Sequence, residues 1–200
     1  MHYTCVLMSQ WYRRMARYNL EQPVGTALAA IALLCFSPPA TAGPQVKAAP
    51  ASDPYTAAAH ATGVPLDLLV AVAGSESGFH PLALNIKGRE IYCRSLAEAR
   101  RILSTTDNVD IGLMQINWPF WGRRLGVSKY DLLDPRCNLL YGARILKEPL
   151  SRGGNIWRRV SDYHAGSVTT RNRYNRKVYS VYLAYLNGRI RRNPSAAIAR

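Results

Sequence analysis

Residues 66–77 constrain the fold more than any other segment, because they read LDLLVAVAGSES and are apolar on nearly every side. A helix without a polar face has to be covered by other elements all round. Further helical patterns lie at residues 54–62, 95–103, 156–164 and 173–186, and from Asp134 onward. No convincing strand alternation or hairpin turn appears. The patterns predict a single all-α domain around a buried helix.

Capping residues mark where several of these helices begin. Asp53 precedes Pro54 in the arrangement of an N-cap followed by proline at the first helical position. Ser95 and Glu98 have the spacing of a capping box, in which each side chain pairs with a backbone N–H at the start of the helix. Pro65 opens the apolar helix.

The N-terminal 42 residues have the pattern of a secretory signal peptide. Basic residues at 13, 14 and 17 precede an apolar run from Val24 to Phe36. Small residues then end at Ala42, where a signal peptidase would cleave. The apolar run has 13 residues, fewer than the roughly 20 that a membrane-spanning helix needs. We therefore expect a periplasmic or secreted protein.

This prediction divides the chain into four parts. A signal peptide spans 1–42, a linker rich in proline and alanine spans 43–53, the folded domain spans 54–187, and a basic tail spans 188–200. Two alternatives stay open at this point. In the first, the apolar segment is not cleaved and stays as a membrane anchor. In the second, translation begins at Met15 rather than at Met1.

The charge balance indicates a polyanionic partner. The net charge is +14, and removal of residues 1–42 leaves 23 basic and 11 acidic side chains, a net charge of +12. Nucleic acid, an anionic membrane and an acidic cell wall all fit such a surface. The export signal and the scatter of basic residues over all the predicted helices disfavour nucleic acid.

Two cysteines, Cys93 and Cys137, remain after export. A lone pair in an exported protein predicts a disulfide. The alternative is two buried free thiols. His60, His80 and His164 stand singly, without ligand spacing to each other or to the cysteines, so we expect no metal site and no cofactor.

Glu76 is the candidate for acid–base chemistry. It lies at the end of the apolar helix and shares one face with Leu69, Val72 and Ala73. Burial and the negative end of the helix dipole both disfavour the charged carboxylate and raise its pKa. A carboxyl group protonated near neutral pH is what a general acid requires. The alternative is a solvated surface glutamate.

A hydrolase that cleaves glycosidic bonds needs a second carboxylate. Asp110 is the nearest candidate, although it also fits a cap or turn residue. The aromatic side chains at 118, 120 and 121 either stack against sugar rings or belong to the core.

Four motifs occur in order along the chain. They are Glu76-Ser77-Gly78-Phe79, the segment GLMQIN at 112–117, the segment YHAG at 163–166, and Tyr174 followed by Val178. The series resembles the lytic transglycosylases of the soluble-lytic (SLT) type, a lysozyme-like family, over residues 54–186. The chain is most similar to the small transglycosylases that accompany conjugation and type IV secretion systems. Those also carry a longer segment between the first two motifs and often a disulfide.

The resemblance implies a lysozyme-like fold of the goose type and a role for each motif residue. Glu76 would protonate the bond between N-acetylmuramic acid and N-acetylglucosamine and then take the proton of the muramic C6 hydroxyl, leaving a 1,6-anhydro end. Tyr174 would hydrogen-bond Glu76. The side chains expected at the glycan groove are those of Ser77, Met114, Gln115, Asn117, Tyr163 and His164. His164 departs from the family pattern, which has asparagine there.

The partners implied are peptidoglycan glycan strands and components of a secretion or conjugation apparatus. Two alternatives remain beside the transglycosylase. One is a muramidase that uses Asp110 to hydrolyse the same bond, and the other is a non-catalytic wall-binding subunit of a secretion apparatus.

Overall fold

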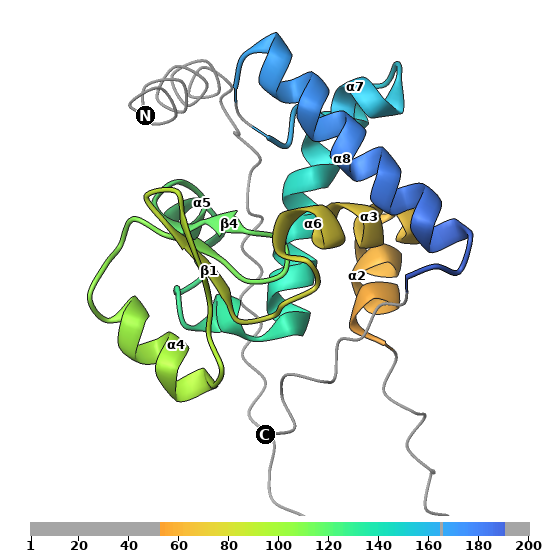
Figure 1. Ribbon diagram of the computed structural model, residues 1–200. Helices are drawn as coiled ribbons and strands as arrows, with labels where there is room; N and C mark the ends of the chain where they lie inside the picture. The colour runs from red at the N-terminus through yellow and green to blue at the C-terminus, as the bar shows by residue number, and fades with distance from the viewer. Residues whose placement is uncertain (1–52, 165, 191–200) are drawn as a thin grey trace, which may run out of the picture.

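The computed structural model describes residues 53–190, except residue 165. These residues form helices and a small sheet (Figure 1). The helices are α2 (Pro54–Thr62), α3 (Leu66–Ser77), α4 (Leu96–Leu103), α5 (Trp118–Leu125), the 3-10 helix η1 (Asp131–Leu133), α6 (Pro135–Ser151), α7 (Ile156–Val160) and α8 (Val168–Leu186). The strands are β1 (Ala83–Ile86), β2 (Arg89–Tyr92), β3 (Asp110–Ile111) and β4 (Ile116–Asn117).

The apolar helix α3 is buried as its sequence predicted. Every residue from Leu68 to Ala73 is at most 2% exposed. α3 packs mainly against α8, and α2 packs against α6. Figure 1 shows α6 between two groups of elements: α2, α3 and α8 on one side, and the sheet with α4 and α5 on the other. A single, mostly helical domain is therefore confirmed.

The sheet is the part of the fold that the sequence reading missed. Its strands are antiparallel in the order β2-β1-β3-β4. β1 and β2 form a hairpin whose turn residues, Lys87 and Gly88, have φ values of 53° and 85°. The expectation of no strands and no hairpin was wrong here. Strands of two to four residues leave little room for alternation, and Lys-Gly lacks the Asn-Gly or Asp-Gly signature of such turns.

Helix starts follow the local sequence more closely than helix lengths do. The side chains of Asp53, Ser95 and Asp134 accept backbone N–H groups at the starts of α2, α4 and α6. The helix expected at 156–164 ends at Val160. The last helix begins at Val168, five residues earlier than expected. α5 was not predicted.

The predicted disulfide is not present, because Cys93 and Cys137 are both free in the structure. Burial raises the pKa of the Cys93 thiol, and the nearby Glu98 carboxylate adds to this. Burial also raises the pKa of Cys137 to about 11, helped by Asp131 and Asp134. A protonated thiol is the unreactive form. The structure thus corresponds to the alternative of two free thiols.

The signal peptide, most of the linker and the tail after residue 190 lie outside the described residues. Within the described part, no helix combines the length and apolar character needed to span a membrane.

Candidate active site

Glu76 lies one residue before the end of α3. The helix stops because Gly78 takes a left-handed conformation, with φ of 61°, and its N–H closes on the Gly74 carbonyl. Glycine adopts this conformation without the steric cost that a side chain would add. The Glu76 carboxyl group therefore stands at the end of a helix whose residues from Leu68 to Ala73 belong to the core.

The surroundings of Glu76 hold its pKa at about 7. Burial is the main cause, and the negative charge of Asp110 acts in the same direction. The Tyr174 hydroxyl donates a hydrogen bond of 2.7 Å to Glu76 Oε1, and this contact and the Lys177 charge lower the pKa. A carboxyl group with a pKa near 7 exists in both protonation states at neutral pH. It can therefore give a proton in one step and take one in the next.

Tyr174 reaches Glu76 from the middle of α8. Its side chain is 7% exposed. The ring of His164 stacks on it, with centroids 4.8 Å apart and planes 8° from parallel. The hydrogen bond that the family resemblance predicted between Tyr174 and Glu76 is thus present.

The segment between β3 and β4, residues 112–115, is a tight turn fastened from α6. Gly112 and Gln115 have φ values of 78° and 45°. Asn138, which is fully buried, donates from Nδ2 to the carbonyls of Ile111 and Leu132, at 2.9 Å each. Its Oδ1 accepts the Met114 N–H at 2.9 Å. This one side chain fixes both ends of the turn.

Two further hydrogen bonds join this turn to the neighbouring motifs. Ser77 Oγ donates to the Leu113 carbonyl at 3.0 Å, and the Tyr163 hydroxyl donates to the Met114 carbonyl at 2.8 Å. Ser77 and Met114 are themselves buried, at 2% and 0% exposed. The contacts that they make in the structure are internal to the protein. Motifs far apart in the sequence are therefore brought together around Glu76.

Asp110 lies close enough to Glu76 to influence its pKa. The Asn117 amide donates a hydrogen bond of 2.7 Å to Asp110 Oδ1, and Asn117 also caps α5 through the Phe120 N–H. Burial raises the pKa of Asp110 to about 6, against the lowering effect of Asn117. Gln115 donates to the carbonyls of Ala83 and Gly112. These polar groups hold the sheet and the turn together beside Glu76.

The aromatic residues proposed for sugar stacking lie in α5 and are only partly exposed. Trp118 Nε1 donates to the Val127 carbonyl at 3.3 Å. The guanidinium carbon of Arg124 lies 3.7 Å from the Phe120 ring centroid, and Phe120 packs edge-on against Trp121. Phe120 and Trp121 therefore pack against each other within α5, and Trp118 contacts a residue that follows the helix.

Two residues that the sequence reading did not single out organise the site. Asn138 is one. Asp162, just before Tyr163, is the other, with Arg171, Arg159 and Arg152 at 3.1, 3.5 and 4.0 Å from its carboxylate. Polar residues are ordinary in surface helices and turns, so neither carried a distinguishing pattern. Arginines at 158, 159, 171 and 173 on either side of a single aspartate were the only sign of the ion-pair cluster in the sequence.

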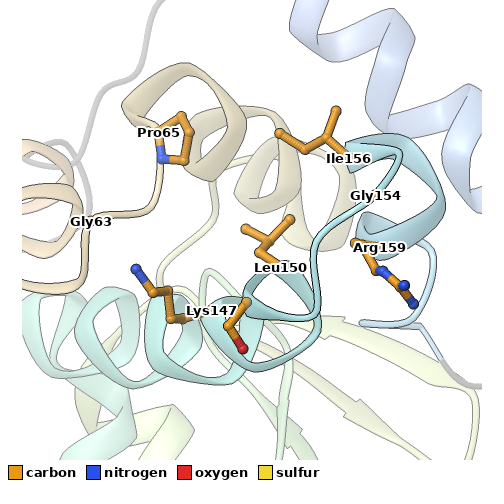
Figure 2. Close-up of a pocket in the computed structure, with 8 residues that line it drawn as sticks. Gly63, Pro65, Lys147, Leu150, Gly154, Ile156 and Arg159 are labelled. Carbon is orange, nitrogen blue, oxygen red and sulfur yellow. The ribbon is translucent and has the colours of Figure 1, made fainter.

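A surface pocket of about 290 Å³ lies on a different part of the molecule, between the α2–α3 connection, α6 and α7 (Figure 2). Its lining includes Pro65, Lys147, Leu150, Ile156 and Arg159, and none of the motif residues. Arg159 already donates to the Gly153 carbonyl at 2.7 Å. Among the described residues, no group of three or more His, Cys, Asp or Glu side chains has the arrangement of a metal site.

Comparison with known proteins agrees with the motif series. The family described as "Transglycosylase SLT domain" matches residues 53–185. Protein IpgF of Shigella sonnei is 29% identical over 140 residues, covering 66% of this chain and 80% of IpgF. The invasion protein IagB of Salmonella typhimurium is 32% identical over 124 residues, covering 58% of this chain and 66% of IagB. No solved structure matches significantly.

Proposed function

Because the chain belongs to the SLT transglycosylase family and is a lytic transglycosylase that acts on peptidoglycan, we propose that Glu76 is its single acid and base. The bond cleaved is the β-1,4 link between N-acetylmuramic acid and N-acetylglucosamine, and the product carries a 1,6-anhydro-muramic end. The observation that carries this proposal is a carboxyl group with a pKa of about 7, hydrogen-bonded by Tyr174 at 2.7 Å.

The reaction balances without water. Protonated Glu76 gives its proton to the glycosidic oxygen, and the N-acetylglucosamine side leaves as an alcohol. The Glu76 carboxylate then takes the proton from the muramic C6 hydroxyl as O6 bonds to the anomeric carbon. The enzyme ends as it began, with a proton on Glu76. One group thus serves both steps, for which a pKa near the working pH is required.

Tyr174 supports the first half of this cycle. Its hydroxyl donates to Glu76 Oε1 and so stabilises the carboxylate that forms when the proton leaves. Ser77, Met114 and Asn138 shape the turn beside the carboxyl group from inside the protein. The side chains proposed to meet the glycan are those of Gln115, Asn117 and Tyr163, which retain partial exposure.

A muramidase that uses Asp110 is the second candidate. One observation favours it: Asp110 is charge-coupled to Glu76, and burial raises its pKa to about 6. Two carboxyl groups with different pKa values are the arrangement found in hydrolysing glycosidases. Against it, Asn117 already occupies Asp110 Oδ1.

The biological setting that we propose is local opening of the cell wall for a secretion or conjugation apparatus. Its support is the similarity to a relative named as an invasion protein, together with the export pattern at residues 1–42. Cleavage after Ala42 would release the enzyme into the periplasm.

Matched carboxamide variants test the site. Glu76→Gln keeps the side-chain shape but cannot transfer a proton, so release of soluble fragments from purified sacculi should fall by at least about 10²–10⁴-fold. Asp110→Asn should keep most of the activity. If both variants are equally inactive, the two-carboxylate muramidase replaces the proposal. Full activity of Glu76→Gln would overturn the assignment of the site.

A further inference from the structure

His164 is the motif residue whose place in the structure departs most from its expected one. The family resemblance places an asparagine here and suggests a contact with sugar. In the structure the imidazole lies flat on the Tyr174 ring, with centroids 4.8 Å apart and planes 8° from parallel. Tyr174 in turn donates its hydroxyl to Glu76 at 2.7 Å. A continuous path of contact therefore runs from His164 through Tyr174 to the acid.

The stacked ring limits where the Tyr174 hydroxyl can go. Tyr174 lies on α8 and His164 lies in the loop that precedes α8, so the two stacked rings come from different segments of the chain. The loop is fastened on its other side by Asp162, which pairs with Arg171 and Arg159, and by Tyr163, which donates to the Met114 carbonyl. An asparagine at 164 has no ring and would leave this face of Tyr174 without its flat partner.

The charges around the path favour a neutral imidazole. Burial lowers the pKa of His164, and Lys177 on α8 lowers it further. The titratable groups that act on Glu76 from the surrounding elements are Tyr174 and Lys177 on α8 and Asp110 on β3; Glu76 in turn raises the pKa of Tyr163. A cationic imidazole would add a positive charge here and favour the Glu76 carboxylate. A neutral ring holds Tyr174 without this effect.

We propose that His164 is a positioning residue whose stacked ring holds the Tyr174 hydroxyl against Glu76. The inference rests on the proposed function of Glu76 and concerns a residue that acts only through Tyr174. Loss of the stack weakens the Tyr174–Glu76 hydrogen bond. That hydrogen bond favours the carboxylate, so its loss raises the pKa of Glu76 and slows the step that forms the carboxylate.

Two substitutions separate the ring from the rest of the histidine. His164→Asn restores the family residue and removes the stack, whereas His164→Phe keeps a flat ring that neither titrates nor donates. For His164→Asn, kcat should fall about tenfold with KM little changed, because misplacement of a catalytic group by about 1 Å can cost roughly 10²-fold. The alkaline limb of its pH–rate profile should move to higher pH. His164→Phe should remain close to wild type in both respects.

A double-mutant cycle with Tyr174→Phe tests whether the effect passes through the hydroxyl. Carbon NMR of labelled glutamate reports the pKa of Glu76 directly and needs no turnover, so it tests His164 separately from the proposed function. His164→Asn should raise this pKa when Tyr174 is present and leave it unchanged in the Tyr174→Phe background. An equal shift in both backgrounds, no shift in either, or His164→Phe behaving like His164→Asn would overturn the proposal. Thermal melts confirm that each variant is folded.

Discussion

Glu76 is of intermediate exposure as a residue, and burial raises the pKa of its carboxyl group. Its protonation is therefore linked to stability. Its pKa is about 7 in the folded protein against 4.5 in an unfolded chain. The folded state consequently binds the proton more tightly. This contribution to stability is full below about pH 4.5 and is lost as the pH rises to about 7.

Glu76→Gln should therefore stabilise the protein increasingly between pH 4.5 and pH 7. The variant has no carboxyl group to ionise, so it avoids a cost of about 2 kcal/mol, allowing for partial solvent exposure. Urea denaturation of both proteins at several pH values measures the difference. A constant difference across this range would mean that Glu76 titrates with an ordinary pKa.

At the scale of single residues, the sequence predicted the buried Glu76 carboxyl group and its hydrogen-bond partner Tyr174, but not the residues that support them. Glu76 was found because it ends an apolar helix, and Tyr174 because its spacing to Val178 fits the family pattern. Asn138 was not found, because its hydrogen-bonding partners lie 24 and 27 residues away in the chain. Only the folded backbone shows that a polar side chain next to Leu139 is needed inside the core.

Among the secondary-structure elements, α6 supports the site in a way that its own sequence does not predict. It carries Asn138 against the 112–115 turn, and Gly142 leaves the space that the Met114 side chain fills. A Cβ at Gly142 would collide with that side chain. The turn is thus fixed by hydrogen bonds and by packing from one helix.

Asn138→Ala should destabilise the protein by about 2–4 kcal/mol, because it leaves the Met114 N–H and two carbonyls buried without partners. Asn172→Ala, on the exposed face of α8, is the matched control and should change stability by less than about 0.5 kcal/mol. Urea midpoints with constant m-values measure both. Equal, small effects would show that the turn does not depend on Asn138.

The helices could be predicted because periodicity and caps are local properties. Asp53, Ser95 and Asp134 each cap a helix through backbone groups two or three residues away. The strands could not be predicted in the same way. β3 and β4 have two residues each. The pairing of β3 with β1 and of β4 with β3 is decided by the position of α6 and the turn rather than by their own sequence.

On the scale of the whole molecule, the fold places α3 and α8 on one side of the site and the sheet on the other, while positive charge is spread over the surface. The predicted mature chain carries a net charge of +12. Peptidoglycan in its wall setting is acidic, so the charge is expected to hold the enzyme on its substrate independently of the contacts around Glu76.

Binding to purified sacculi should therefore weaken as salt rises through physiological levels, where the screening length is about 8 Å. Glu76→Gln is the protein to use, because it should bind without digesting the sacculi. Co-sedimentation over a series of salt concentrations measures the effect. Binding that does not change with salt would assign the affinity to direct glycan contacts instead.

The most direct test of the account is mass spectrometry of the fragments that the wild-type enzyme releases from peptidoglycan. An anhydro end and a reducing end differ by one water. If Glu76 is the only acid and base, every new muramic end should be the 1,6-anhydro form, and Glu76→Gln should release none. New reducing ends from the wild-type enzyme would contradict the account, because they require a water molecule and a second group to activate it.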